Sequence, residues 1–171
     1  GLVTDEQLLD DKNNLYIAAV TAPQKKTDSC WGLSILDIST GEFLAGEFSS
    51  YVTVLDELSR MTPSEILLPE KQLEDKEGMA HTLSIQICQI LPTVCITPRP
   101  EYNFQKDRAR DQLLEHFKVA NLAGFGCEQM TSGLSAAGGL FAYIIETQKT
   151  NLSHINKLSP IDLNDVLIID E

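Results

Sequence analysis

The chain has 171 residues, 43% of them hydrophobic and 22% charged, which is the composition of a folded globular domain. This balance excludes an intrinsically disordered or collagen-like protein, and the length suits one domain. Thirteen basic residues against 25 acidic residues give a net charge of −12, which disfavours nonspecific binding of nucleic acid by this chain alone.

Residues 15–22 form an almost continuous apolar run, which predicts a strand buried on both faces. A polar loop follows at 23–29. Apolar residues then alternate over 31–35 and resume at 42–48. Because a glycine-containing turn at 37–41 separates these two runs, we predict a β-hairpin.

One helix is predicted between the hairpin and a fourth strand. Ser49 or Ser50 can cap its start, and Pro63 ends it. The short apolar run 65–69 predicts the fourth strand, and a polar stretch follows up to Gly78. The apolar side chains of the helix recur on one helical face and are Val54, Leu55, Leu58 and Met61.

The next two predicted elements are a helix and a strand. The apolar spacing over 79–91 favours a helix, although an alternation within this segment also fits a strand. Residues 93–97 are rich in strand-forming residues and predict a fifth strand, which Pro98 stops.

Two helices follow, over 104–118 and 132–149. Small residues at 136–139 would let the second helix approach a neighbour closely, so we place this helix in the core. Residues 151–164 are polar and contain proline, which predicts a linker. Because the apolar, strand-like run 166–169 ends close to the last residue, we expect the parent polypeptide to continue beyond it.

This order of elements describes a sheet that begins with three antiparallel strands and gains parallel strands through helical crossovers. We therefore predict an α/β protein with a ribonuclease-H-like mixed sheet flanked by helices. A flavodoxin-like, doubly wound fold is the alternative. It needs a helix between the first two strands, and the loop at 23–29 is too short to hold one.

The motifs of common catalytic and metal sites are absent from the sequence. A nuclease of this topology holds metal ions between carboxylates, one of them on the first strand, but residues 15–22 contain none. Asp37 and Glu70 are interpreted as turn-capping or surface acids. There is no phosphate-binding loop, no nucleophile elbow, no C-x-x-C pair and no histidine in a ligand spacing. The sequence thus predicts no catalytic, cofactor-binding or metal-binding residues.

Several segments together carry a family resemblance. They are LVTDEQLL (2–9), LDISTGEF (36–43), PSEILLPE (63–70), HF (116–117), GFG (124–126), AAGG through ETQK (136–149) and DVLIIDE (165–171). In this order and spacing they resemble the connector domain of the bacterial MutS DNA mismatch repair proteins, with short flanks. Residues 71–100 contain no motif that we can match to this family.

The resemblance implies three parts of the chain. Residues 1–14 would be a linker from the preceding domain, 15–150 a ribonuclease-H-like connector domain, and 151–171 a linker with the truncated start of the next domain. The implied function is noncatalytic: the connector couples mismatch recognition to an ATP-driven clamp and offers a docking surface to MutL. The family's Phe-x-Glu mismatch wedge and its ATPase loop are absent here. Mismatched DNA, ATP and magnesium would therefore be bound only by the parent protein.

We expect a cytoplasmic protein without membrane contact, whose partners are a MutL-like protein and the neighbouring domains of its own chain. The expected partner surface is the polar face of the helix at 104–118. Two other functions stay open, a metal-dependent ribonuclease-H-like nuclease and a stand-alone adaptor of the same fold. The residues expected at the partner surface, which could also be an ordinary solvated helix face, are Arg108, Asp111, Gln112 and Glu115.

Overall fold

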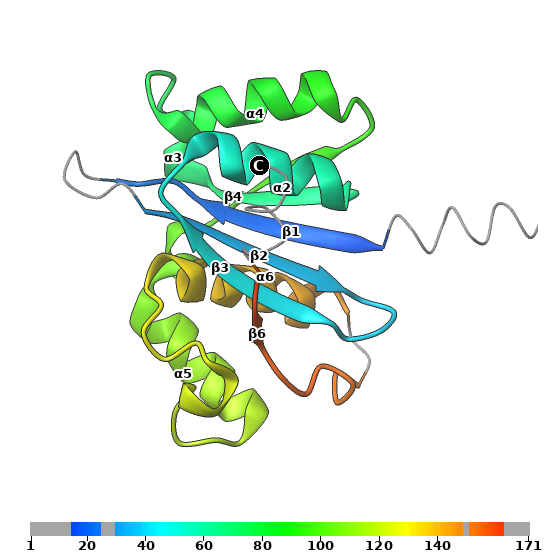
Figure 1. Ribbon diagram of the computed structural model, residues 1–171, viewed down its shortest axis with the longest axis vertical. Coiled ribbons are helices and arrows are strands. Elements are labelled where there is room, and N and C mark those ends of the chain that lie inside the picture. The colour runs from blue at the N-terminus through cyan, green and yellow to red at the C-terminus, as the bar shows by residue number, and fades with distance from the viewer. Residues whose placement is uncertain (1–14, 25–29, 149–150, 163–171) are drawn as a thin grey trace, which may run out of the picture.

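The computed structural model of the protein describes residues 15–24, 30–148 and 151–162. The predicted linker at 1–14 and the strand-like run at 166–169 lie outside these residues. Within them, a six-stranded sheet carries helices on both faces (Figure 1). None of the described helices is both long enough and apolar enough to cross a bilayer.

The sheet has the strand order β5-β4-β1-β2-β3-β6. The strands are β1 (Tyr16–Thr21), β2 (Trp31–Asp37), β3 (Phe43–Phe48), β4 (Glu65–Pro69), β5 (Cys95–Arg99) and β6 (Ser159–Pro160). β2 pairs antiparallel with β1 and with β3, whereas every other pair in this sheet is parallel. The predicted mixed, ribonuclease-H-like sheet is therefore confirmed.

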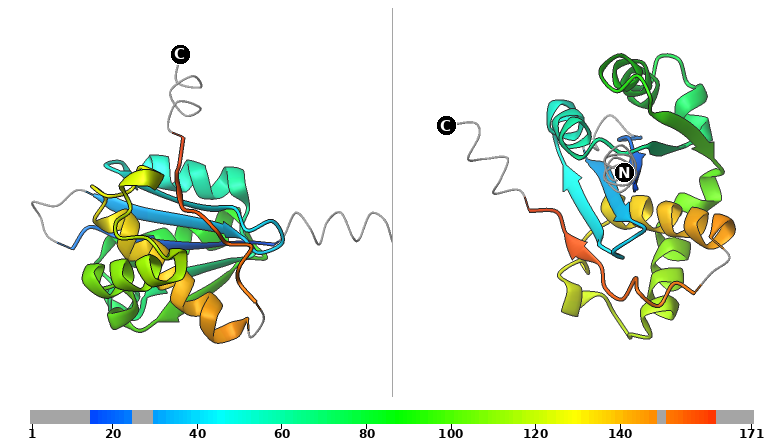
Figure 2. Two further views of the ribbon diagram at one scale, coloured as in Figure 1. Left: turned by 90° about the horizontal axis from the view of Figure 1, so that it is seen from below. Right: turned by 90° about the vertical axis from the view of Figure 1, so that its right-hand side faces the viewer.

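The helices form two layers around the sheet. They are α2 (Tyr51–Met61), α3 (Glu70–Glu74), α4 (Met79–Ile90), α5 (Lys106–Phe117) and α6 (Ser132–Thr147), with the 3₁₀ helices η1 (Glu101–Phe104) and η2 (Ala123–Phe125). Figure 1 shows α2, α3 and α4 on one side of the sheet and α5 and α6 on the other, and Figure 2 shows the same layers from two further directions.

Strand β1 is buried on both faces, as its apolar run predicts. Ile17 and Ala19 belong to the core beneath α5 and α6, whereas Ala18 and Val20 belong to the core beneath α2 and α4. This division follows from the two-residue period of a strand, whose successive side chains point to opposite faces. The hairpin of β2 and β3, predicted from alternation, lies next to β1.

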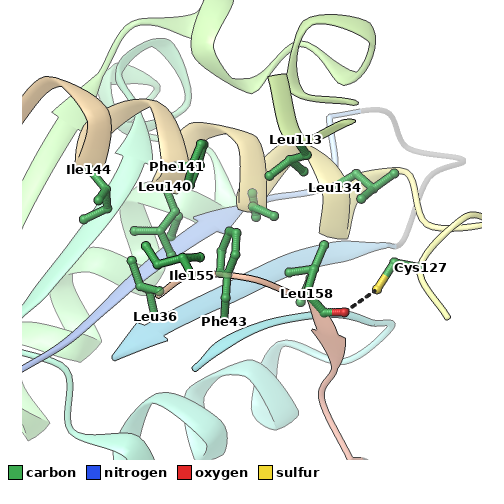
Figure 3. Packing of buried hydrophobic residues seen from close by; sticks show 14 of the residues in the cluster. Leu36, Phe43, Leu113, Cys127, Leu134, Leu140, Phe141, Ile144, Ile155 and Leu158 are labelled. Carbon is green, nitrogen blue, oxygen red and sulfur yellow. Dashed lines mark hydrogen bonds between the residues drawn. The ribbon is translucent and has the colours of Figure 1, made fainter. Parts of the chain in front are cut away.

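Helix α6 lies at the centre of one layer, as its small residues predict. A Cβ atom added to Gly138 would lie 2.1 Å from the Cβ of Ala109 on α5, and one added to Gly139 would lie 2.3 Å from the Phe104 ring. Only glycine permits this approach. On the sheet side of α6, the rings of Phe141 and Phe43 stack 6.1 Å apart (Figure 3).

The prediction that Pro98 stops the fifth strand is wrong, because β5 runs on to Arg99. The amide of Cys95 donates to the carbonyl of Ser64, at 3.0 Å, on the side of β4. Backbone groups alternate sides along a strand, so Pro98 turns its missing N–H toward the open edge of the sheet. A proline at that position removes no ladder bond and also blunts the edge against pairing with other chains.

Residues 151–162 differ from the linker predicted over 151–164. Ile155, Leu158 and Ile161 are buried, and β6 pairs with β3. The amide of Ile161 donates to the carbonyl of Ala45 at 2.9 Å. The polar composition of the segment concealed these apolar side chains, which are separated by polar residues and show no regular period.

Smaller differences concern element ends. The polar stretch after β4 includes the short helix α3, and Phe104, predicted in the following helix, lies in η1 instead. Ser50 is the N-cap residue of α2, but its side chain makes no capping hydrogen bond. Thr62 ends α2 in the left-handed region, with φ of 47°.

Candidate interaction surface

The polar side of α5 contains the residues predicted to contact a partner. Arg108, Asp111 and Glu115 are exposed and Gln112 is partly buried. Their spacing of three and four residues places them on one side of the helix, which we call the α5 face. The structure therefore brings these four residues together, and their role in binding stays a prediction.

An exposed aromatic side chain extends the α5 face. The guanidinium carbon of Arg108 lies 4.8 Å from the ring centre of Tyr102, which is 51% exposed on η1. Such a cation–π contact contributes roughly 0.5 to 1 kcal/mol at an exposed site and restrains a long side chain. Tyrosine and arginine are also the residue types enriched at protein interfaces. The sequence analysis missed Tyr102, which precedes the helix.

Helix α5 is fixed to its surroundings by two side chains, Arg110 and His116. Arg110 forms an ion pair with Glu128, whose second oxygen accepts the amide of Leu122 at 2.7 Å. The Leu122 amide and then Arg110 hold the pKa of Glu128 below its usual range. Near the C-terminal end of α5, His116 Nε2 hydrogen-bonds the carbonyl of Ile155 at 2.6 Å. The α5 face thus lies on a helix that is held in place at two positions.

A polar network that the sequence did not reveal joins α6 to the edge of the sheet. Glu65 of β4 accepts hydrogen bonds from the hydroxyls of Tyr143 at 2.7 Å and Thr97 at 2.5 Å. Arg99 lies over the Tyr143 ring at 5.0 Å and pairs with Glu146. Burial, and then the nearby Glu65 carboxylate, raise the pKa of Tyr143 to about 12, so the phenol keeps its proton and remains a donor. The network links three elements that are distant in sequence.

The start of α6 has an acidic partner. One oxygen of Glu47, on β3, accepts the amides of Thr131 at 2.8 Å and Gly133 at 2.9 Å. These amides lack partners within the helix, and the N-terminal end of a helix favours negative charge. Since Glu47 is more than 80 residues away, no local capping signal could have predicted it.

The two acids considered as metal ligands, Asp37 and Glu70, occupy a turn and an exposed helix start. Asp37 Oδ1 accepts the amide and hydroxyl of Ser39 and the amide of Thr40, so it closes the turn of the hairpin. Burial alone would raise the pKa of Asp37, but these hydrogen bonds outweigh burial and lower it. Glu70 is an exposed residue in the first turn of α3. Across the described ranges, no three His, Cys, Asp or Glu side chains converge as a metal site.

The chain matches one family of known proteins over most of its length. The family model of MutS domain II covers residues 15–156. Similar curated proteins include the DNA mismatch repair proteins MutS of Trichodesmium erythraeum (strain IMS101), 37% identical over 177 residues, and of Thermosynechococcus vestitus (strain NIES-2133 / IAM M-273 / BP-1), 36% identical over 176 residues. Each alignment covers 99% of this chain but 19% of the relative, so the chain spans about a fifth of their length. The chain thus belongs to the family of MutS domain II, the connector domain of these DNA mismatch repair proteins.

Proposed function

We propose that this chain is the noncatalytic connector module of a longer MutS protein. It couples mismatch recognition to the ATP-driven clamp and presents the α5 face to MutL. Mismatched DNA, ATP and magnesium bind elsewhere in the parent protein. The observation that carries this proposal is the match to MutS domain II over residues 15–156, together with a fold whose candidate partner residues share one exposed helix face.

The packing of α6 supports the coupling role. A module that passes a displacement between two domains has to move as one body, and close packing without voids transmits strain. Helix α6 is in contact with α5 through Gly138, with η1 through Gly139 and with the sheet through Phe141. The network around Glu65 adds a polar connection to β4 and β5. Together these contacts restrain the layer of α5 and α6 against sliding on the sheet.

The net charge of the chain supports a role in binding protein rather than DNA. A net charge of −12 repels DNA, so this module stands off the duplex that the parent protein binds. The α5 face nevertheless combines Arg108, Asp111 and Glu115, which have both signs of charge. Mixed charges of this kind set the orientation and association rate of a partner more than they add affinity.

Charge reversal on the α5 face tests the docking role. In the full-length MutS protein, Arg108→Glu with Asp111→Lys swaps two charges and leaves the net charge unchanged. We expect at least a tenfold weaker affinity for MutL, which corresponds to about 1.4 kcal/mol, measured by surface plasmon resonance on mismatched DNA with ATP.

A matched control makes the same exchange elsewhere. Lys76→Glu with Glu77→Lys reverses two exposed charges between α3 and α4, far in sequence from α5. This variant should bind MutL within about twofold of the unmodified protein. If the α5 variant binds as well as this control, the α5 face is not the docking surface.

A further inference from the structure

Glu57, on the buried side of α2, is a carboxylate that is almost completely removed from water. Its side chain is 1% exposed, whereas that of its ion-pair partner Arg60, three residues later on the same helix, is 49% exposed. Arg60 donates to Glu57 Oε2 at 2.6 Å. An ionised carboxylate can accept about four hydrogen bonds, and a buried charge is costly unless such bonds replace its hydration. One ion pair therefore leaves Glu57 with unused acceptor capacity.

The second carboxylate oxygen of Glu57 opens into a pocket. Oε1 accepts no hydrogen bond from any residue that the structure describes. Across the same residues, Arg99 Nε is the one side-chain nitrogen or oxygen that is both fully buried and without a partner, so Glu57 Oε1 must be accessible. The space beside it is a pocket of about 350 Å³, which Glu57 lines. A ligand in this pocket can therefore reach Oε1.

The pocket lies between the C-terminal end of α2, the strands of the hairpin and the segment that follows β6. Leu44, Met61 and Ile161 contribute apolar walls, and the exposed side chain of Glu42 lies on the polar side. Altogether the lining has three carboxylates and one guanidinium, that of Arg60. The pocket thus combines an excess of negative charge with aliphatic walls.

This composition selects an organic cation over other small ligands. The carboxylates disfavour an anion, and the C-terminal end of α2 adds partial negative charge that favours a cation. A metal ion fits less well, because no three His, Cys, Asp or Glu side chains of the described ranges converge as a metal site. The aliphatic walls suit a cation whose charge is carried on a chain of methylene groups.

We propose that this pocket binds a primary alkylammonium group, whose nitrogen donates to Glu57 Oε1 and whose methylene chain lies along Leu44, Met61 and Ile161. An ammonium group has three donors and no acceptor, which complements a carboxylate oxygen without a hydrogen-bond partner. The proposal does not depend on the proposed function. Ile161 also lies beyond residue 156, where the match to MutS domain II ends, so that match does not account for the pocket.

Two sources can supply the alkylammonium group, a free aliphatic diamine and a lysine side chain of the same chain. Lys12 is the single basic residue among the first 15 positions. It precedes Tyr16, which lines the pocket, by four residues. Because four residues span at most about 14 Å, the sequence allows Lys12 to supply the group.

Titration of the 171-residue chain with 1,4-diaminobutane tests the proposal. The methyl signals of Leu44, Met61 and Ile161 are followed by nuclear magnetic resonance. We expect their shifts to saturate, with a dissociation constant in the millimolar range, as suits so small a ligand. The diol 1,4-butanediol has the same carbon chain without the charge, and should shift none of these signals.

Glu57→Gln tests the acceptor. We expect this variant to bind the diamine about tenfold more weakly, because it removes the charge from the hydrogen bond with the ammonium group. Glu74→Gln is the matched control, because it removes one exposed carboxylate from α3, which does not line the pocket through this residue. The control should bind the diamine within about twofold of the original chain.

Three results would overturn the proposal. Shifts that never saturate, or that spread over the acidic surface, would show that the diamine is a mere counterion to the net charge of −12. Equal binding of the diol would show that the pocket does not recognise charge. Equal affinity of Glu57→Gln and Glu74→Gln would show that Glu57 is not the acceptor.

A second variant covers the case in which Glu57→Gln unfolds the chain, because this change also takes the partner of Arg60. Unfolding is detected by alkylation of Cys127, which is buried in the folded chain. Glu42→Gln, at an exposed position of the pocket, then replaces Glu57→Gln. It should weaken diamine binding by about threefold, and an unchanged affinity would overturn the proposal.

Lys12→Ala identifies the source of the alkylammonium group. Tighter binding of the diamine by this variant would support the proposal with Lys12 as the occupant, because the diamine would no longer compete with a lysine. An unchanged affinity, with saturable binding that still depends on Glu57, would support the proposal with a free amine as the ligand.

Discussion

Replacing Gly138 by alanine tests the close contact between α5 and α6. In an open helix this change is stabilising by about 1 kcal/mol, because alanine is the better helix former. Here the new Cβ would lie 2.1 Å from the Cβ of Ala109 and 2.6 Å from its Cα. Carbon atoms in contact are about 3.5 to 4.0 Å apart, so the helices have to separate by more than 1 Å. Overpacking of this severity costs about 3 kcal/mol.

The net expectation for Gly138→Ala is a loss of about 2 kcal/mol, the overpacking cost less the helix-propensity gain. For a chain of this length, that loss lowers the midpoint of thermal unfolding by roughly 4 to 8 °C. Gly124→Ala is the control, because a Cβ there would meet no atom within 4 Å and the residue has no positive φ. Circular dichroism or calorimetry measures both variants. A Gly138→Ala protein as stable as the original would refute the close α5–α6 packing.

Three other predictions concern side chains with defined partners. Tyr143→Phe removes one donor to Glu65 and should cost about 1 to 2 kcal/mol in urea unfolding; an unchanged midpoint would contradict the network. The lowered pKa of Asp37 stabilises the fold above about pH 4, and this contribution is lost as the pH falls through the folded-state value. Asp37→Asn should therefore reduce the loss of stability that urea unfolding records as the pH falls below about 4, and a loss of the same size in this variant would exclude Asp37 as a contributor. Burial raises the pKa of the Cys127 thiol to about 11, so at pH 8 alkylation should leave Cys127 unmodified while Cys95 reacts; equal rates would show that Cys127 is accessible.

Regular periods in the sequence predicted most of the sheet and its helices. The continuous run of β1, the alternation in β2 and the helical spacing of α2 are local patterns, and each element formed where its pattern lies. The stripe at 136–139 also predicted where α6 would be approached closely, because only small side chains leave room for another helix. The helix period over 79–91 prevailed over the alternative strand, and α4 covers most of that segment.

The polar contacts that fix α6, the helix against which α5 packs, have no local signature in the sequence. Glu65 and Tyr143 are 78 positions apart, and Glu47 meets the start of α6 across more than 80 residues. Pairing between such positions depends on the sheet topology, which sequence periodicity alone does not encode. Segment 151–162 shows the converse problem, because its polar composition concealed Ile155 and Leu158, which complete the core (Figure 3). Helical spacing predicted that the residues of the α5 face share one polar side of the helix. It does not predict which protein binds there.

Hydrogen exchange in the full-length protein most directly tests the claim that this chain moves as one rigid, noncatalytic module. Backbone amides of β1 and α6 would be followed by mass spectrometry in the mismatch-bound state and after ATP is added. If the module passes motion between its neighbours as a single body, the protection of both elements stays the same in the two states. Loss of protection in α6 on adding ATP would mean that the module deforms internally, and would contradict the account.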